Sequence, residues 1–253
     1  MRKIVTSLSL AFCLIGSAVV ANSQDSAAKA NGTAPAGTTP AGSTVAITPA
    51  STPMDLARAA LAAQGGDKFK NLKSLVLRGD VDLYAPGSAQ SVPGKFEIVQ
   101  ASGDRYRLEV ASVFPFTMAF NGERTTSSVG MFSLPDLSKV GLGVLTKLDQ
   151  TGYTITALPD KKKQRAFRVT GPDGSATDFV IDALTGRVVK YTVPFNGGTF
   201  IVEHDNLKEF EGVLVPYKIA QSFETSKGTF IAEFKVKTVT VNQPVGDDIF
   251  VIQ

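Results

Sequence analysis

The amino-acid sequence predicts a mainly β protein of the α+β class, built on one strongly curved antiparallel sheet. Apolar and polar residues alternate with a period of two in nearly every segment after Ser74, which is the pattern of half-buried strands. Turn residues such as Asn196-Gly197-Gly198 separate these segments at short intervals, as in antiparallel sheets. With 253 residues, 43% of them hydrophobic, the chain is long enough for one sizeable domain.

The first 21 residues have the plan of a secretory signal peptide. Arg2 and Lys3 precede an uncharged, mostly apolar run over 4–20, and small residues follow at its end. The alternative is an uncleaved membrane anchor, although the run is short for a span. Cys13, the single cysteine, follows bulky Phe12 inside the run, so we expect no lipid on it. A mature chain without cysteine is typical of the bacterial periplasm, where we expect this protein.

Residues 22–52 are predicted to form a disordered linker, and residues 53–253 a single folded domain. The linker consists of Ala, Thr, Ser, Gly, Pro and Asn almost throughout, which offers too little apolar surface to offset the entropy of ordering. The formal net charge of +3 includes Arg2 and Lys3, so the chain without its signal segment carries +1. This balance gives no reason to expect a nucleic-acid partner.

Two helical segments accompany the strands. Thr52 and Pro53 are suited to start a helix through "MDLARAALAAQ", which Gly65-Gly66 ends, and a second short turn follows in "DKFKNLKSL". The segment 133–148 has apolar residues at helical spacing around two glycines, which predicts a short or broken crossover helix. Four or five strands are expected before the crossover and six to eight after it, with both helices on the concave side of the sheet.

The strand patterns contain two further local predictions. A bulge is expected at Gly79 in "SLVLRGDVDLY", and 101–103 is expected to form a hairpin turn between "GKFEIVQ" and "DRYRLEVAS". In "FPFTMAF" (114–120), alternate positions carry Phe, Phe, Met and Phe, so one face of this strand is expected to be strongly apolar. That face either completes a filled core or lines a hollow for a ligand.

The inventory of reactive side chains is sparse. His204 is the only histidine and lies in "FIVEHDN", where we expect it to be solvated near a turn. Glu97, Glu109, Glu203 and Glu233 occupy the polar phase of their strands and are expected to face solvent. Neither a G-x-S-x-G elbow nor a phosphate-binding loop occurs, and there is no tryptophan. We therefore expect no catalysis, no metal site and no cofactor.

The layout resembles that of LolA-like outer-membrane lipoprotein-sorting proteins. The resemblance covers residues 53–253 and includes "DKFKNLKSLVLRGDV", "FVIDALTGRVVKYTV" and "DNLKEFEGVLVPYKI". The residues at its turn positions are Asp182, Thr185, Gly186, Gly212, Pro216, Asp248 and Phe250. It implies an incomplete antiparallel β-barrel wrapped around apolar helices, with a hollow that takes acyl chains of lipids or lipoproteins.

Two functional hypotheses follow from the residues and the resemblance together. In the first, the protein is a periplasmic carrier or binding module for acyl chains. The residues expected to line its hollow are Phe96, Ile98, Tyr106, Leu108, Phe114, Phe116, Met118, Phe120, Val140, Leu142 and Leu145. In the second, the same residues form a filled core, and the domain is an interaction or sensor module of the RseB type with an envelope protein as partner.

Overall fold

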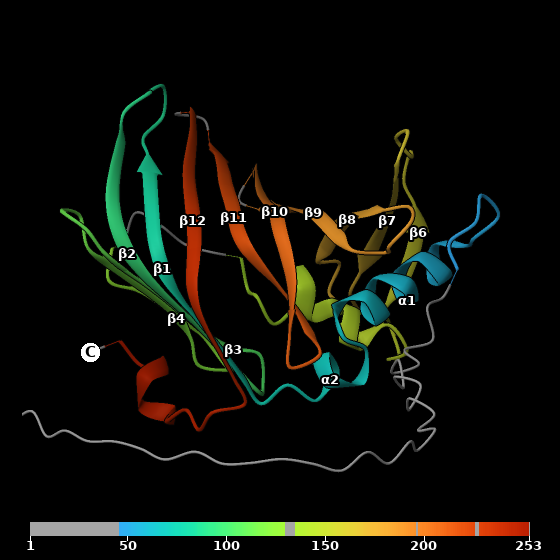
Figure 1. Cartoon of the computed structure of the whole chain (residues 1–253), viewed down its shortest axis with the longest axis horizontal. Coiled ribbons are helices and arrows are strands. Elements are labelled where there is room, and N and C mark those ends of the chain that lie inside the picture. Colours follow the sequence, from blue (N-terminus) through green and yellow to red (C-terminus); the bar gives the residue numbers. More distant parts are fainter. Residues whose placement is uncertain (1–45, 130–134, 196, 226–227, 253) are drawn as a thin grey trace, which may run out of the picture. The chain divides into compact units, whose positions relative to one another are not determined.

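The fold is that of a computed structural model, which describes residues 46–129, 135–195, 197–225 and 228–252 (Figure 1). All of these residues belong to one unit, Ala41–Gln253. The predicted signal peptide, most of the predicted linker and residues 133–134 of the predicted crossover lie outside the described residues. Within the described part of the chain, no helix is long and apolar enough to cross a membrane.

Two α-helices and two 3₁₀ helices are described: α1 (Pro53–Gln64), α2 (Asp67–Lys70), η1 (Gly141–Lys147) and η2 (Asp247–Phe250). The predicted start of α1 is confirmed, because Thr52 accepts a hydrogen bond from the Asp55 amide and Asp55 accepts one from the Thr52 amide. This reciprocal capping satisfies two amides that a helix start leaves without partners. Gly65, at φ 122°, ends the helix as predicted.

Ordered contacts begin before Pro53. Ile47 packs against the buried residues around α1, and Arg165 donates a hydrogen bond from Nη1 to the carbonyl oxygen of Thr48, with 2.6 Å between the atoms. The folded part of the chain therefore includes residues that composition alone places in a linker.

Twelve strands form one antiparallel sheet. The strands are β1 (Ser74–Tyr84), β2 (Ser91–Ala101), β3 (Arg105–Ala111), β4 (Phe116–Phe120), β5 (Thr125–Ser127), β6 (Thr154–Ala157), β7 (Gln164–Thr170), β8 (Ala176–Asp182), β9 (Val188–Phe195), β10 (Gly198–Phe210), β11 (Val213–Thr225) and β12 (Gly228–Val241). Their spatial order is β5-β4-β3-β2-β1-β12-β11-β10-β9-β8-β7-β6. The sheet curves without closing, since β5 and β6 lie at its two ends (Figure 1). The predicted mainly β class and the incomplete barrel are confirmed.

The strands that come first and last in the sequence, β1 and β12, join the two halves of the sheet. β1 pairs with β12, and the register shifts between Arg78 and Gly79, which confirms the predicted bulge. A Cβ atom at Gly79 would lie 2.0 Å from the backbone oxygen of Lys235, so only glycine fits this approach. The predicted hairpin turn is also present, because β2 ends at Ala101 and its partner β3 begins at Arg105.

Two apolar clusters lie on the inner side of the sheet. The first, which we call the sheet core, joins residues of β1–β4 and β9–β12, including Phe96 and Phe234 with ring centroids 4.9 Å apart. The second, the helix core, packs α1 and η1 against β7, β8 and the start of β9. Tyr191 packs against both clusters. The helices therefore cover the inner side of the β6–β9 half, as Figure 1 shows for α1.

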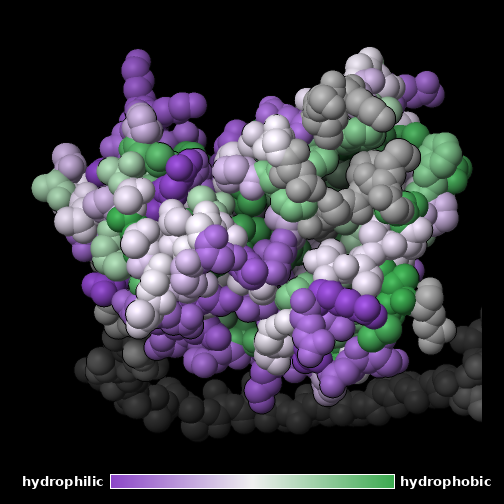
Figure 2. Space-filling view, turned by 180° about the vertical axis from the view of Figure 1, so that it is seen from behind, coloured by the Kyte–Doolittle hydropathy of each residue, from purple (hydrophilic) through white to green (hydrophobic). Residues whose placement is uncertain are grey.

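A third, smaller apolar cluster lies on the other face of the sheet. Val76 and Val99 pack there against Phe250 of η2. Arg107 donates a hydrogen bond from Nη1 to the carbonyl oxygen of Ile249, and the Arg105 guanidinium lies 5.1 Å from the Phe250 ring centroid. The view from behind shows apolar and polar residues interspersed over the surface of the molecule (Figure 2).

One prediction of local structure is confirmed and one requires correction. The predicted short or broken crossover helix is present as the seven-residue 3₁₀ helix η1, preceded by Val140 in an extended conformation. Gly141, the first residue of η1, has φ +74°, so an α-helix cannot run into η1 from the preceding residues. The strand in 114–120 begins only at Phe116, because Pro115 has no amide to donate to the sheet and Ser112 holds the Phe114 amide in a turn.

Candidate ligand-binding cavity

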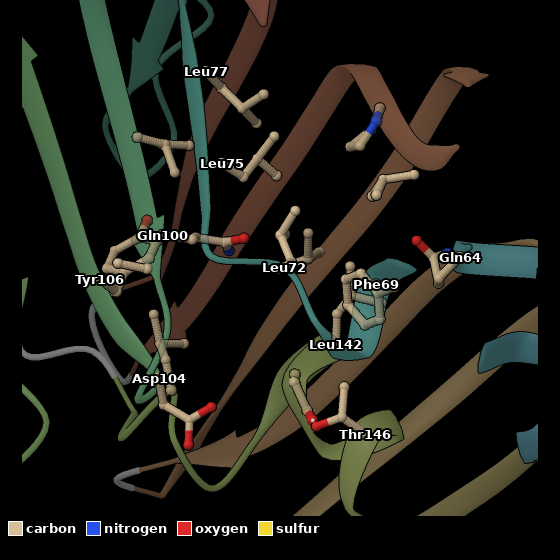
Figure 3. A pocket seen from close by; sticks show the side chains of 18 of the residues that line it. Gln64, Phe69, Leu72, Leu75, Leu77, Gln100, Asp104, Tyr106, Leu142 and Thr146 are labelled. Carbon is tan, nitrogen blue, oxygen red and sulfur yellow. Dashed lines mark hydrogen bonds between the residues drawn. The ribbon is translucent and has the colours of Figure 1, made fainter. Parts of the chain in front are cut away.

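A cavity of about 300 Å³ lies on the inner side of the sheet, between the strands and the segments that carry α2 and η1. It is at the lower end of the range of about 300–1,000 Å³ that is typical of ligand sites. Figure 3 shows Leu75, Gln100 and Tyr106 on the strand side of the cavity, with Gln64 across from them. Phe69 of α2 and Leu142 of η1 lie between these two groups.

Most of the wall is apolar. Leu75 and Leu77 of β1 are buried and face the cavity beside Ile98 of β2. Phe200 and Val202 of β10 contribute the opposite part of the sheet wall. An apolar surface of this kind gains free energy when a hydrocarbon chain displaces water from it.

Only some of the residues that were predicted to line a hollow face the cavity. Ile98, Tyr106, Val140 and Leu142 do line the cavity. Five others are buried outside its lining: Phe96, Leu108, Met118 and Phe120 in the strands, and Leu145 in the helix core. Phe116 is half-buried and packs against the sheet core.

The prediction for Phe114 is wrong for this cavity, since the residue is 72% exposed in the turn before β4 and lies outside the lining. The apolar face of β4 meets β3 through the pairs Tyr106–Phe120, Leu108–Met118 and Val110–Phe116. This stretch therefore belongs mainly to the filled core, and the hollow begins nearer to β1 and β2.

Polar side chains interrupt the apolar wall. Gln64, Gln100, Gln221, Tyr106, Tyr191 and His204 all line the cavity. Burial raises the pKa of the Tyr106 hydroxyl well above its usual value, and the nearby Tyr191 hydroxyl raises it further. Burial likewise raises the pKa of Tyr191. Both hydroxyls are therefore neutral at physiological pH.

The environment of His204 corrects the prediction of a solvated histidine. The side chain is partly buried in the cavity wall, and its ring centroid lies 5.7 Å from that of Tyr191. Burial lowers the pKa of His204 from 6.5 to about 4, against the effect of a hydrogen bond to the backbone of Val188. The imidazole is therefore neutral at pH 7. β10 continues past it to Phe210 through an irregularity at Asn206, so His204 is not at a strand end.

The strand alternation and helical spacing in the sequence indicate that these polar residues lie on the inner side. His204 shares the inward phase of Phe200 and Val202, and Gln100 shares that of Ile98. Gln64 follows Leu56 and Ala60 at helical spacing, on the buried face of α1. The expectation that His204 is solvated rested on its polarity, whereas its strand phase indicates the inner side of the sheet.

Three contacts hold η1 over the cavity. Lys147 donates a hydrogen bond from Nζ to Asp104 Oδ2 at 2.8 Å and another to the carbonyl oxygen of Ser138 at 2.6 Å. At the other end of η1, the Gly141 amide donates a buried hydrogen bond of 3.0 Å to Thr177 Oγ1. The segment is therefore attached to the β2–β3 turn on one side and to β8 on the other.

The four glutamates in the polar phase of the strands do not line the cavity. Glu109, Glu203 and Glu233 are exposed, and Glu97 is half-exposed and pairs with Arg78, as their strand phase predicts. Among the described residues, no group of three or more His, Cys, Asp or Glu side chains is arranged to hold a metal ion.

Comparison with known proteins supports the fold through structure rather than sequence. No protein-family model and no curated protein matches the sequence. A LolA superfamily protein from Nitrosomonas europaea matches with a TM-score of 0.52 at 15% identity, over 80% of this chain and 99% of the other. A DUF1329 family protein from Desulfovibrio piger matches with a TM-score of 0.52 at 8% identity, over 79% of this chain and 95% of the other.

A third similar structure is an outer membrane lipoprotein-sorting protein domain from Vibrio parahaemolyticus. Its TM-score is 0.47 at 10% identity, over 78% of this chain and 95% of the other. The domain thus has the LolA-like fold, as the resemblance at its turn positions implies.

Proposed function

We propose that this protein is a non-catalytic binding or carrier module that holds an acyl chain in the cavity beneath η1. The observation that carries the proposal is the apolar cavity itself, which lies on the inner side of a LolA-like sheet and is only partly filled by the domain's own helices. Each methylene group of a chain that enters it gains about 0.8 kcal/mol through burial. We propose that it acts in the bacterial envelope, which the secretory features of residues 1–21 favour.

The position of η1 supports reversible binding. Its seven residues form a 3₁₀ helix, whose hydrogen bonds have poorer geometry than those of an α-helix. Leu142 of this helix is half-buried and lines the cavity. Displacement of one short segment would therefore admit a chain without disturbing the strand ladders.

The test is extraction and mass spectrometry of the protein purified from its own envelope without detergent. We expect acyl lipid at close to one chain-bearing molecule per protein. The variant Leu142→Asp introduces a charge into the apolar wall and should lose this lipid. The matched control is Leu184→Asp, at a residue 93% exposed, which should retain it. Absence of lipid from both the wild type and the control contradicts the proposal.

A second candidate function, that of an interaction or sensor module, is favoured by a different observation. Val113 and Phe114 are 75% and 72% exposed at the β3–β4 turn, which is unusual for adjacent large apolar residues. The double change Val113→Ser and Phe114→Ser should weaken binding to an envelope protein if this module acts through that turn. Pull-down from envelope extract with both forms measures the difference.

A further inference from the structure

Two buried polar atoms in the cavity wall have no hydrogen-bond partner among the described residues. They are Nε2 of Gln64 and Nδ1 of His204. A buried polar group without a partner destabilises a protein by about 1–3 kcal/mol, so native structures contain few of them. Both residues line the same cavity, although Gln64 lies on α1 and His204 on β10.

The two atoms require opposite partners. The Gln64 side chain is 1% exposed, and its amide nitrogen is a donor that needs an acceptor. The hydrogen bond between His204 and the Val188 backbone favours the protonated ring, so the backbone group is the carbonyl oxygen. Because Nδ1 has no partner, Nε2 is the donor in that bond. Nδ1 of the neutral ring then has a lone pair and needs a donor.

The charged residues of the wall do not offer a site for an ionised head group. The charged residues that line the cavity are Lys70, which is exposed to solvent, Asp104, which is paired with Lys147, and Arg105, which is paired with Asp247. A carboxylate or phosphate in the buried part of the cavity would therefore leave water while Arg105 is already paired and Lys70 stays in solvent, which is strongly unfavourable.

We propose that the ligand has a neutral polar group with both a hydrogen-bond donor and an acceptor, such as a hydroxyl or a secondary amide, attached to its acyl chain. This inference rests on the proposed function and specifies its ligand class. Gln64 donates to the acceptor of that group and His204 Nδ1 accepts from its donor, while the chain lies against the apolar wall. Both side chains are specificity-determining residues in this arrangement.

The inference is tested by competition against a bound probe, pyrene-labelled methyl decanoate, at pH 7.5. The competitors are 1-decanol, decyl methyl ether and decanoate. The ether differs from the alcohol by one methyl group, which removes the donor and makes the compound more apolar. The hydrophobic effect alone therefore favours the ether. We expect decanol to displace the probe at a concentration about five- to tenfold lower than the ether, and decanoate to compete least.

Two variants test whether Gln64 and His204 cause the preference for decanol over the ether. Gln64→Leu and His204→Phe should each reduce the advantage of decanol over the ether to about twofold or less, while the ether still displaces the probe. Gln90→Leu is the matched control, because Gln90 is exposed and lies outside the cavity lining, and it should keep the preference. Gln64→Leu should also leave the ligand-free protein at least as stable in urea, since it removes an unpaired buried donor.

The outcomes separate this inference from the proposed function. If the ether or decanoate competes as well as decanol, the chain binds but the neutral donor–acceptor group is wrong. If Gln64→Leu destabilises the ligand-free protein, the amide has a partner there and the inference is overturned. If neither the probe nor any competitor binds, the proposed function fails, and the ligand class fails with it.

Discussion

At the scale of single residues, His204 shows how position overrides residue type. The ring occupies an inward-facing site on β10 beside Tyr191, whereas its neighbours Glu203 and Asp205 are exposed on the other phase of the strand. Burial disfavours the charged imidazole more than the Val188 hydrogen bond favours it, and the pKa falls to about 4. The folded protein therefore resists protonation of a group that the unfolded chain protonates readily.

The first prediction is a loss of stability on mild acidification. The unfolded chain binds a proton at His204 near pH 6.5 and the folded protein near pH 4, so the unfolded state binds more protons between these values. The free energy of unfolding should therefore fall as pH decreases through this window, by at most about 3 kcal/mol from this residue. Urea unfolding at pH 7.5, 6, 5 and 4 measures the effect.

His204→Phe is the control for the acid effect. His204 is the only histidine in the chain, so the variant removes all histidine titration while the carboxylates still titrate with pH. The wild-type curve should drop more steeply than that of the variant between pH 6.5 and 4. Parallel curves would show that the ring is solvated in solution, as the sequence pattern alone suggests.

At the scale of elements, the conformation of the crossover depends on tertiary contacts that a sequence pattern does not contain. Apolar spacing in 133–148 indicates a helix, but Gly141 adopts a positive φ. A Cβ atom at this position would point toward the Tyr191 ring, 3.5 Å away. The segment takes its conformation from tertiary contacts: the Thr177 hydrogen bond at one end and the Lys147–Asp104 ion pair at the other. Residues so distant in the sequence leave no local signal of their pairing.

The second prediction concerns the attachment of η1. Lys147→Met removes a partly buried ion pair and the hydrogen bond to Ser138, and leaves Asp104 without its cation. We expect a loss of about 1–2 kcal/mol in the free energy of unfolding and faster release of a bound acyl probe. Urea unfolding and stopped-flow dissociation measure the two effects.

Lys139→Met is the matched control for the η1 attachment. Lys139 lies in the same segment, but its side chain is 51% exposed and pairs with Asp136 and Asp173 at the surface. Surface pairs of this kind contribute about 0–1 kcal/mol, so release of the probe should not change. Equal effects of the two substitutions would show that Lys147 does not hold the segment over the cavity.

At the scale of the whole domain, the sheet depends on the pairing of β1 with β12. These strands are separated by nearly the whole folded chain, yet they join the β2–β5 half to the β6–β11 half. Contacts between such distant segments make a fold slow to form and sensitive to errors at the junction. Gly79 lies at the bulge of this junction, in direct contact with the Lys235 backbone.

The third prediction is that Gly79→Ala disrupts the domain. The added Cβ would meet the Lys235 oxygen at 2.0 Å, so the two strands must separate at the bulge. We expect a loss of more than about 3 kcal/mol or failure to fold. Gly87→Ala is a control in a loop with no atom within 4 Å of the new Cβ, and only its φ of +71° opposes the change. A wild-type Tm for Gly79→Ala would contradict the described junction.

The sequence was sufficient for the sheet but not for the cavity. Alternation and turn residues predict the strands, the Thr52 cap and the Gly79 bulge, because these depend on local periodicity and backbone conformation. The cavity depends on which inward-facing residues lack a neighbour across the sheet. Ile98 and Phe96 have the same strand phase, yet Ile98 faces the cavity and Phe96 packs against Phe234. No pattern within one strand distinguishes them.

The most direct test of the central claim is a titration of pyrene-labelled methyl decanoate into the wild type, Leu142→Trp and Leu184→Trp. Leu142 lines the cavity and Leu184 is 93% exposed, so the same change fills the hollow in one variant and leaves it open in the other. An acyl-binding cavity predicts saturable binding at one site in the wild type and Leu184→Trp, with at least tenfold weaker binding in Leu142→Trp. Binding that is absent from the wild type, or equal in all three proteins, would contradict it.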